Sequence, residues 1–447
     1  MSVPEINVGI MTEKKINFEL YGDFDINRTG KTLSGKFKAE VQGDKIIVQD
    51  KGQKLEFEKE VLFTPTNPAT ESFTLRDVVI GVDFHWQRKE KQNFSGILKF
   101  LANENKLTAI NTISIDEYLK SVISSEMSAK CNIELLKAHS VISRSWLLAQ
   151  IEKSKTIKQE RVDYSSTILK EDEITKWYDR EDHALFDVCA DDHCQRYQGV
   201  TKIFTDIAVT AVEETKGIVL TDSLGKVCDA RFYKACGGIT EAFENVWEPK
   251  HFDYLVPVVD YKYEPDNYKT DFTVEANAVK WIKSSPQAYC NTTDKKILAQ
   301  VLLDYDQETS DFYRWRIEYT QAELAELIRK KRGIDFGDIA DIIPIQRGAS
   351  ARLIKMKIVG SKRTMIVGKE LEIRKTLSKS HLYSSAIVIE KEDLKNGIPQ
   401  KFVIYGAGWG HGVGLCQIGA AVMSENNFHF DEILNHYYHN SHLKKIY

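Results

Sequence analysis

A glutamate and an arginine in one stretch, residues 121–146, carry the side chains best suited to acid–base chemistry. Apolar residues recur at helical spacing before Glu126 and share its side of the expected helix: Ile115, Leu119, Val122 and Ile123. Arg144 lies well into a second expected helix, which begins after a break at residues 128–131 with Asn132 as its N-cap. These residues leave two alternatives open: a buried ion pair between Glu126 and Arg144, or a carboxyl group with a catalytic task.

A second group of residues could bind a metal. His183, Cys189, His193 and Cys194 offer two imidazoles and two thiols within twelve positions, a set that suits tetrahedral Zn²⁺. Their spacing is not that of a standard zinc finger. A disulfide between Cys189 and Cys194, or two buried free thiols, would explain the same residues. Gln195 and Tyr197 leave this loop in strand-like alternation.

The third stretch, GAGWGHGVGLCQIGA, places six glycines between residues 406 and 419 around Trp409, His411 and Gln417. Such a density of glycine predicts a loop whose backbone can approach a ligand. It is a weak signal for a nucleotide phosphate, because the stretch has no lysine and no closing serine or threonine. A helix is expected to begin at Gln417.

The elements that must position these residues indicate an α+β fold with mostly antiparallel strands. Residues 6–113 alternate in short runs typical of hairpins. We expect an N-terminal β-rich domain at 1–112, a core with a catalytic helical hairpin at 113–260, an inserted helical subregion at 261–311, and the rest of the core at 312–447. Locally we expect a short helix around Trp177, a strand over 363–373, and an exposed, frayed C-terminal tail.

Composition narrows the class of protein. The chain has 447 residues, 42% hydrophobic and 28% charged, with a net charge of −4. That charge argues against a nucleic-acid partner, which needs a basic surface. We expect no transmembrane segment, because no run approaches about 18 apolar residues. The seven cysteines are odd in number and widely spread, so no disulfide scaffold is implied.

Several motifs in order resemble the stage II sporulation protein D family, which includes the amidase enhancers. They are IDEYLKSVISSEM, ELLKAHSVISRSWLLA, DVCADDHCQRYQG, YKACGGIT and GWGHGVGLCQIGAA. The resemblance implies a lytic transglycosylase that cleaves peptidoglycan strands between N-acetylmuramic acid and N-acetylglucosamine, preferring strands stripped of stem peptides. It also implies that Glu126 and Arg144 are catalytic and that His183, Cys189 and Cys194 bind zinc. The usual proline after the SEM motif is absent.

In such a mechanism Glu126 donates a proton to the glycosidic oxygen and then takes one from the C6 hydroxyl, which attacks internally. A direct ion pair would keep Glu126 ionised, so we expect Arg144 to orient a loop or to bind a sugar substituent. We expect Trp409, His411 and Gln417, with Gln195 and Tyr197, to bind substrate. The zinc would be structural, and catalysis would need no cofactor.

Two other functions remain open. One is a non-enzymatic enhancer that binds glycan or a cell-wall amidase, and the other is a metallohydrolase that uses the His/Cys cluster. The first residues, MSVPEINVGIMTEKK, lack the features of a secretory leader. Because peptidoglycan lies outside the cytoplasm, we nevertheless expect a periplasmic or cell-envelope location, with the leader removed.

Overall fold

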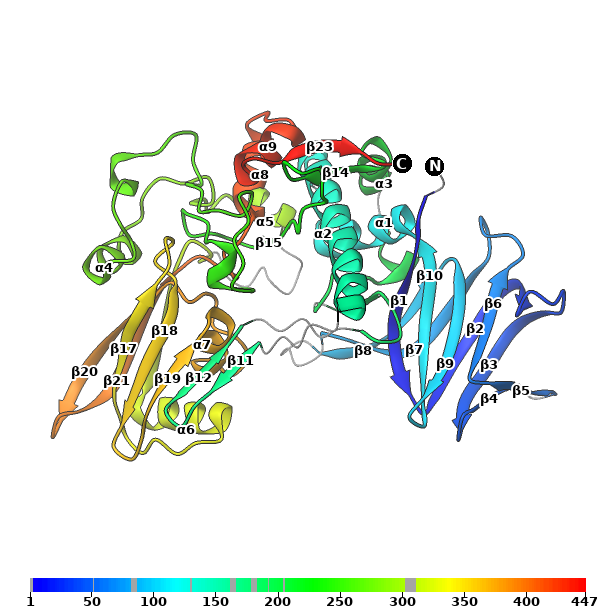
Figure 1. The fold of residues 1–447 in the computed structure, drawn as a ribbon, viewed down its shortest axis with the longest axis horizontal. Coiled ribbons are helices and arrows are strands. Elements are labelled where there is room, and N and C mark those ends of the chain that lie inside the picture. The colour runs from blue at the N-terminus through cyan, green and yellow to red at the C-terminus, as the bar shows by residue number, and fades with distance from the viewer. Residues whose placement is uncertain are drawn as a thin grey trace.

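The computed structural model describes residues 3–50, 52–81, 87–128, 131–160, 166–177, 183–191, 193–203, 206–301 and 311–447. In Figure 1 a large N-terminal sheet lies at one end, a second group of strands lies at the other, and a group of helices lies between them. The fold is α+β with mostly antiparallel strand pairs, which confirms the fold class expected from the sequence. The limits assigned to the four sequence regions remain a prediction.

The N-terminal sheet follows from period-2 alternation in its sequence. In β2 (Lys15–Ile26), Ile16, Phe18 and Leu20 are buried between more exposed neighbours. The Phe18 ring packs against those of Phe63 and Phe100, with centroids 5.5 and 5.1 Å apart. The other strands of this 11-stranded sheet are β1 (Glu5–Glu13), β3 (Thr32–Gln42), β4 (Lys45–Gln49), β5 (Lys54–Glu58), β6 (Glu60–Pro65), β7 (Ser72–Ile80), β8 (Arg88–Phe94), β9 (Ile97–Asn103), β10 (Lys106–Ser114) and β13 (Val188–Cys189).

Two consecutive helices leave this sheet, as the sequence predicts. The helix α1 (Ile115–Glu126) begins where the Ser114 hydroxyl accepts a hydrogen bond from the N–H of Glu117 at 3.3 Å. The helix α2 (Ile133–Glu160) begins after Asn132, whose Oδ1 accepts from the N–H of Glu134 at 3.0 Å. The expected N-cap is confirmed, and the helices α3 (Asp206–Glu214), α8 (Gln417–Glu425) and α9 (Phe430–Tyr437) pack against this pair.

The second group of strands forms two sheets. A five-stranded sheet has the order β11 (Thr167–Leu169), β12 (Glu173–Lys176), β19 (Thr364–Gly368), β18 (Leu353–Gly360) and β17 (Ile339–Arg347). A three-stranded sheet has the order β16 (Arg314–Thr320), β21 (Ile398–Ala407) and β20 (Ile387–Lys395). The helices α6 (Gln321–Arg332) and α7 (Glu370–Thr376) complete their shared core.

Three local expectations are wrong or incomplete. Residues 173–176 are not part of a helix near Trp177, because β12 pairs in parallel with β19. The strand expected over 363–373 ends at Gly368, and α7 follows with acidic residues in its first turn and basic residues in its last. The exposed C-terminal residues form β23 (His442–Lys445), which pairs with β14 (Ile218–Thr221) instead of fraying.

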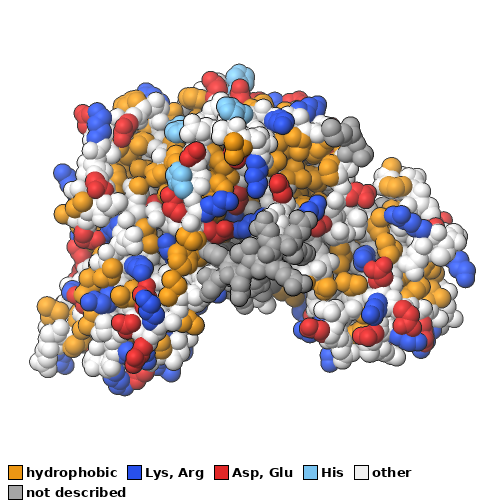
Figure 2. Space-filling view, viewed as in Figure 1, with side chains coloured by type: hydrophobic (Ala, Val, Ile, Leu, Met, Phe, Trp, Pro, Cys, Tyr) orange, Lys and Arg blue, Asp and Glu red, His pale blue; other side chains and the backbone are white. Residues whose placement is uncertain are grey.

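The remaining elements are short and connect these parts. They are β15 (Phe232–Tyr233), β22 (Leu415–Cys416), η1 (Gly199–Lys202), η2 (Phe243–Asn245), η3 (Asp266–Tyr268), α4 (Glu275–Lys283) and α5 (Lys295–Val301). Among the described residues, no helix combines the length and apolar character needed to span a membrane. On the face drawn in Figure 2, basic and acidic side chains are interspersed, with no large area of a single sign.

Candidate functional site

Glu126 is the last residue of α1, and its side chain is half-buried. Its Oε1 accepts a hydrogen bond from the backbone N–H of Arg196 at 3.1 Å. Within the described ranges, its other oxygen has no hydrogen-bonding protein partner. One oxygen is therefore fixed by the backbone while the other is left for a bound molecule, an arrangement suited to a group that donates and accepts a proton.

The segment that supplies the N–H of Arg196 is held along α1. The hydroxyl of Ser121 donates to the carbonyl oxygen of Gly199 at 2.7 Å and accepts from the N–H of Gln198 at 3.2 Å. Both hydrogen bonds are buried, where an unmade bond would be costly. The helix therefore both carries Glu126 and positions the backbone that contacts it.

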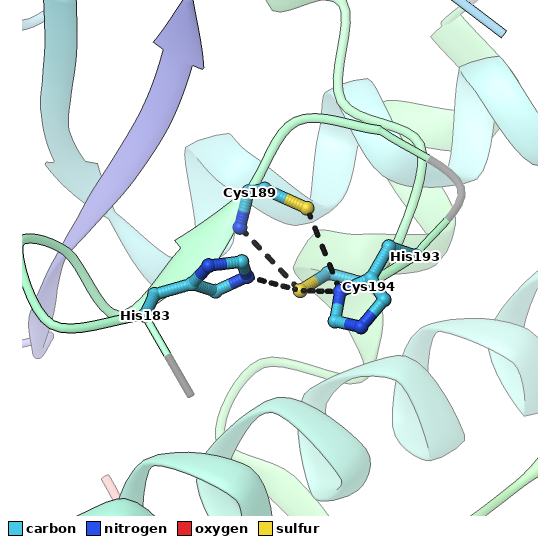
Figure 3. Close-up of side chains that lie close together, drawn as sticks. All are labelled: His183, Cys189, His193 and Cys194. Atoms are coloured by element: carbon cyan, nitrogen blue, oxygen red, sulfur yellow. Dashed lines mark hydrogen bonds between the residues drawn. The ribbon is translucent and has the colours of Figure 1, made fainter. Parts of the chain in front are cut away.

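His183, Cys189, His193 and Cys194 converge just before this segment. Their candidate ligand atoms all lie within 4.8 Å of one another, and the four side chains are half-buried. Figure 3 shows both imidazole rings beside the sulfur of Cys194, with His183 Nε2 at 3.4 Å and His193 Nδ1 at 3.6 Å. The structure thus brings together the three residues predicted to bind metal, and His193 with them.

The cluster is built on the N-terminal sheet. Cys189 lies in β13, which pairs in parallel with β1 through Gly9. The carboxylate of Asp187 accepts from the N–H of Asn7 at 2.8 Å. A side chain at Gly9 would collide with the ring of Phe186, since its Cβ would lie 2.4 Å from that ring. These contacts fix the loop where the sheet meets α1.

Electrostatics at the cluster favour a thiolate. The hydrogen bond to Cys194, together with those to His183 and His193, outweighs burial and holds the pKa of the Cys189 thiol far below its ordinary value. Thiolates are the form of cysteine that binds metals. Burial, reinforced by these thiols, raises the pKa of Tyr118 well above its usual range, so its phenol stays neutral beside the loop.

Gln195 and Tyr197 do not occupy the position expected of substrate-binding residues. Their side chains are 2% and 1% exposed. The Tyr197 ring stacks on that of Tyr118 at 5.0 Å, and its hydroxyl donates to Asn111 at 2.6 Å. Residues 195–198 form no strand, and the side chains of Gln195 and Tyr197 both lie in the core, where they cannot contact a sugar.

Arg144 also lies away from any ligand. Its guanidinium is fully buried, and its Nη1 donates to the carbonyl oxygens of Thr215 and Ile218 at 2.9 and 3.1 Å. Its ion pair is with Asp116 at 3.3 Å. The ion pair with Glu126 that the sequence left open as an alternative is therefore absent, as we expected, and complete burial excludes the sugar-binding role. The contacts match the other expectation, that Arg144 orients a loop.

Trp409 and His411 lie in the glycine-rich loop but face different neighbours. Trp409 is half-buried and stacks on Tyr383 with ring centroids 3.9 Å apart. His411 Nε2 lies 3.0 Å from the carbonyl oxygen of Phe232, and its ring packs edge-on against Trp247. Burial lowers the pKa of His411 well below its usual value, so its imidazole is neutral. Trp409 also packs against Phe312, and His411 against Tyr233; within the described ranges, none of the hydrogen bonds and ring contacts of either residue is with Glu126.

The glycines of this loop serve packing within the protein. A Cβ at Gly412 would lie 2.6 Å from the guanidinium carbon of Arg352, and one at Gly414 would lie 2.1 Å from the carbonyl oxygen of Arg231. Both have positive φ, which glycine adopts without strain. The expectation that these glycines let a ligand approach the backbone is therefore wrong at these two positions.

Gln417 is the residue of the loop that reaches the end of α1. Its Nε2 lies 3.8 Å from the sulfur of Met127, which follows Glu126, and 3.1 Å from Nε2 of His139. Burial lowers the pKa of His139 to about 3, so its ring is neutral and can accept this hydrogen bond. The sequence analysis did not identify His139. Its helical spacing from the buried residues Leu135, Leu136 and Ser143 could have placed it on the buried side of α2.

Comparisons with known proteins match two parts of the chain to family models. Residues 103–221 match a family model described as Stage II sporulation protein, and residues 241–414 match one described as Domain of unknown function (DUF8618). An uncharacterized protein of Brachyspira hyodysenteriae is 24% identical over 345 residues, which cover 77% of this chain and 70% of that protein. The amidase enhancer of Bacillus subtilis is 26% identical over 345 residues, which cover 72% of this chain and 39% of the enhancer.

The first matched range contains Glu126, Arg144 and the His/Cys cluster. Over residues 103–221 the chain matches the stage II sporulation protein family, and the resemblance to this family and to the amidase enhancers read from the motifs is confirmed. It spans well under half of the amidase enhancer's length.

Proposed function

We propose that this protein acts on the peptidoglycan of the cell wall as a lytic transglycosylase, with Glu126 as general acid and base. The observation that carries the proposal is the placement of this carboxyl group. It ends a buried helix, one oxygen accepts the N–H of Arg196, and the other has no protein partner among the described residues. The family and its amidase enhancer member support a substrate in the cell wall.

In the proposed reaction the free oxygen of Glu126 donates its proton to the glycosidic oxygen between N-acetylmuramic acid and N-acetylglucosamine. The C6 hydroxyl of the muramic acid then attacks its own C1, and Glu126 takes the hydroxyl proton. Water is not consumed, and the product has a 1,6-anhydro end. An ordinary glycoside hydrolase needs two carboxylates flanking the scissile bond. Here the C6 hydroxyl is an internal nucleophile, so one carboxyl group is enough.

We propose that a zinc ion bound by His183, Cys189 and Cys194, with His193 as a fourth ligand, holds the loop beside Glu126. Two thiols and two imidazoles whose ligand atoms lie within 4.8 Å fit a tetrahedral site. Four protein ligands leave no position for a catalytic water, so the ion would be structural and the metallohydrolase alternative is disfavoured. Its contribution would be to fix Arg196, two residues beyond Cys194, against the carboxyl group.

Trp409 and His411 are the predicted substrate-binding residues that keep part of their surface exposed. The Trp409 ring packs against both Tyr383 and Phe312, so the part of it that stays exposed is what a sugar could contact. Gln417 is buried, and we assign it to support of the end of α1. Since the substrate lies outside the cytoplasm, we propose a periplasmic or cell-envelope location.

The test is incubation of purified, peptide-stripped glycan strands with the wild type and with Glu126→Gln. The wild type should produce anhydro ends, seen by mass spectrometry as termini lacking one water, and the variant should be slower by about 100-fold or more. Glu117→Gln is the matched control, because Glu117 lies on the same helix with its side chain 45% exposed and paired with Lys120, away from Arg196. Absence of anhydro ends with folded wild-type protein would refute the enzymatic proposal.

The second candidate is an enhancer of an N-acetylmuramoyl-L-alanine amidase, favoured by the similarity to the Bacillus subtilis protein. In that case the protein would bind glycan or the amidase without cleaving a bond. Adding wild type or Glu126→Gln to an amidase acting on intact wall distinguishes the two. Equal stimulation by both proteins, with no anhydro ends, would support the enhancer.

A further inference from the structure

A second group of metal-binding side chains lies outside the site described above. Cys236, Asp260, Cys290 and Cys416 are all buried, and their candidate ligand atoms lie within 4.8 Å of one another. The sulfurs of Cys236 and Cys290 are 3.3 Å apart. These residues are distant in sequence, and the chemistry proposed for Glu126 uses none of them.

Backbone donors surround the sulfurs as they do in metal-thiolate sites. The sulfur of Cys416 accepts hydrogen bonds from the N–H groups of Cys236 at 3.2 Å and Gly419 at 3.4 Å. The sulfur of Cys236 accepts from the N–H of Gly238 at 3.2 Å. Cys416 is also the N-cap of α8, so the positive end of that helix faces its sulfur. Each of these contacts favours a thiolate.

The carboxyl group of Asp260 has no basic partner. Its oxygens accept hydrogen bonds from the hydroxyl of Tyr437 at 2.6 Å and the N–H of Cys290 at 2.9 Å. In the part of the chain that the structure describes, no lysine, arginine or histidine forms an ion pair with it. A buried carboxylate is costly unless it is paired or coordinates a metal.

We propose that Cys236, Cys290, Cys416 and Asp260 bind a second zinc ion, which is structural. Tetrahedral Zn²⁺ has Zn–S distances of about 2.3 Å, which place its sulfur ligands about 3.8 Å apart. The sulfurs of Cys236 and Cys290, 3.3 Å apart, lie somewhat closer than this, and no two of the four ligand atoms are more than 4.8 Å apart. Binding would release the thiol protons to solvent and leave the ion coordinated by three thiolates and one carboxylate oxygen.

A disulfide between Cys236 and Cys290 is the competing arrangement. It would use two of the four side chains and leave the third thiol and the buried carboxyl group without a partner of opposite charge. All four ligand atoms lie within 4.8 Å of one another, so the third thiol and the carboxyl group belong to the same group as the pair. The geometry therefore favours a metal.

The ion would join three segments that are also linked by the pairing of β15 with β22 and by a hydrogen bond from Lys234 to the carbonyl oxygen of Val301. Cys236 precedes the Gly237–Gly238 turn, Cys290 lies between α4 and α5, and Cys416 leads directly into Gln417. Because Gln417 contacts Met127 beside Glu126, the ion would brace α8 behind the proposed acid. It would also fasten the region between α4 and α5 to the core.

The test uses the full chain, expressed with zinc and purified without a histidine tag. Metal per chain is measured by elemental analysis in the wild type, in Cys290→Ser and in Cys194→Ser. We expect Cys290→Ser to lose about one zinc ion while retaining the ion at the His/Cys cluster, and Cys194→Ser to lose only the latter. Cys228→Ser is the control, because Cys228 is buried but belongs to neither cluster.

The double variant Cys189→Ser/Cys194→Ser isolates the second site and tests it without altering its ligands. X-ray absorption at the zinc edge should show about three sulfurs at about 2.3 Å and one lighter ligand. Absence of zinc from this folded variant, or recovery of a Cys236–Cys290 disulfide from unreduced digests of the wild type, would overturn the proposal. Neither outcome depends on whether the protein cleaves glycan.

Discussion

Replacing Arg144 with methionine should strongly destabilise the protein while leaving the chemistry of its folded fraction intact. The buried guanidinium donates to the carbonyl oxygens of Thr215 and Ile218, to the hydroxyl of Tyr447 at 3.1 Å, and to Asp116. Methionine keeps much of the aliphatic stem but provides no donor. The variant therefore removes the interactions and leaves most of the volume.

The loss of stability can be worked out from the buried groups that lose the guanidinium as their partner. A buried carbonyl that loses its donor costs about 1–3 kcal/mol, and loss of one partner of a buried ion pair costs about 3–5 kcal/mol. These contributions overlap, and Asp116 keeps the hydrogen bond from Tyr447 at 2.8 Å. We expect a total loss of about 3–5 kcal/mol, which is a large part of the roughly 5–15 kcal/mol by which a domain is typically stable.

Urea unfolding followed by circular dichroism measures this loss. With a urea dependence of about 2 kcal/mol/M, the midpoint should fall by about 1.5–2.5 M. Asp116→Asn alone should be destabilising, and the double variant should be more stable than the sum of the two losses predicts, because the pair is coupled.

Glycan cleavage per folded molecule distinguishes a positioning residue from a catalytic one. Below the unfolding transition, Arg144→Met should retain most of the wild-type rate. An unchanged urea midpoint combined with a lost reaction would refute the reasoning, because it would mean that the guanidinium acts on the substrate.

Three further predictions test packing, protonation and metal binding. Gly412→Ala should lower the free energy of unfolding by about 2 kcal/mol or more, whereas Gly397→Ala, which also has positive φ but meets open space, should cost about 1 kcal/mol; equal shifts in thermal unfolding would contradict the packing argument. Burial lowers the pKa of His139 to about 3 in the folded protein, so between about pH 6.5 and pH 3 only the unfolded chain binds a proton at this imidazole. The stability that the neutral, buried His139 contributes is therefore complete above about pH 6.5 and is lost as the pH falls toward 3. His139→Gln should flatten the dependence of the urea midpoint on pH by about one proton, and parallel profiles would exclude the assignment. Cys194→Ser should make residues 183–203 cleavable by protease under native conditions, and Cys228→Ser should not; identical digestion patterns would count against a metal holding that loop.

Features encoded within about one helical turn or one short loop could be predicted from the sequence. Asn132 caps α2, α8 begins at Gln417, and Glu126 ends α1 with a half-buried side chain. His183 and Cys194 are close in space because only a short loop separates them. In each case the chain itself limits how far apart the atoms can be, so spacing alone carries the information.

Features that depend on what packs against an element could not be predicted in this way. Alternation correctly placed Gln195 and Tyr197 on one side of the segment, but only the packing on α1 made that side the interior. The glycines of the C-terminal loop predicted a close approach, and the tertiary structure decided that the approaching groups are Arg352 and Arg231 of the same chain.

By itself, the sequence determined the family resemblance, the α+β class, the position of Glu126 and the proximity of the His/Cys residues. Only the tertiary structure decided that Arg144 pairs with Asp116 and that Cys236, Cys290 and Cys416 meet around Asp260. The physical reason is that long-range partners are selected by burial. A guanidinium or thiol removed from water must find a compensating group, and that group is set by the packing of whole elements, which local spacing does not encode.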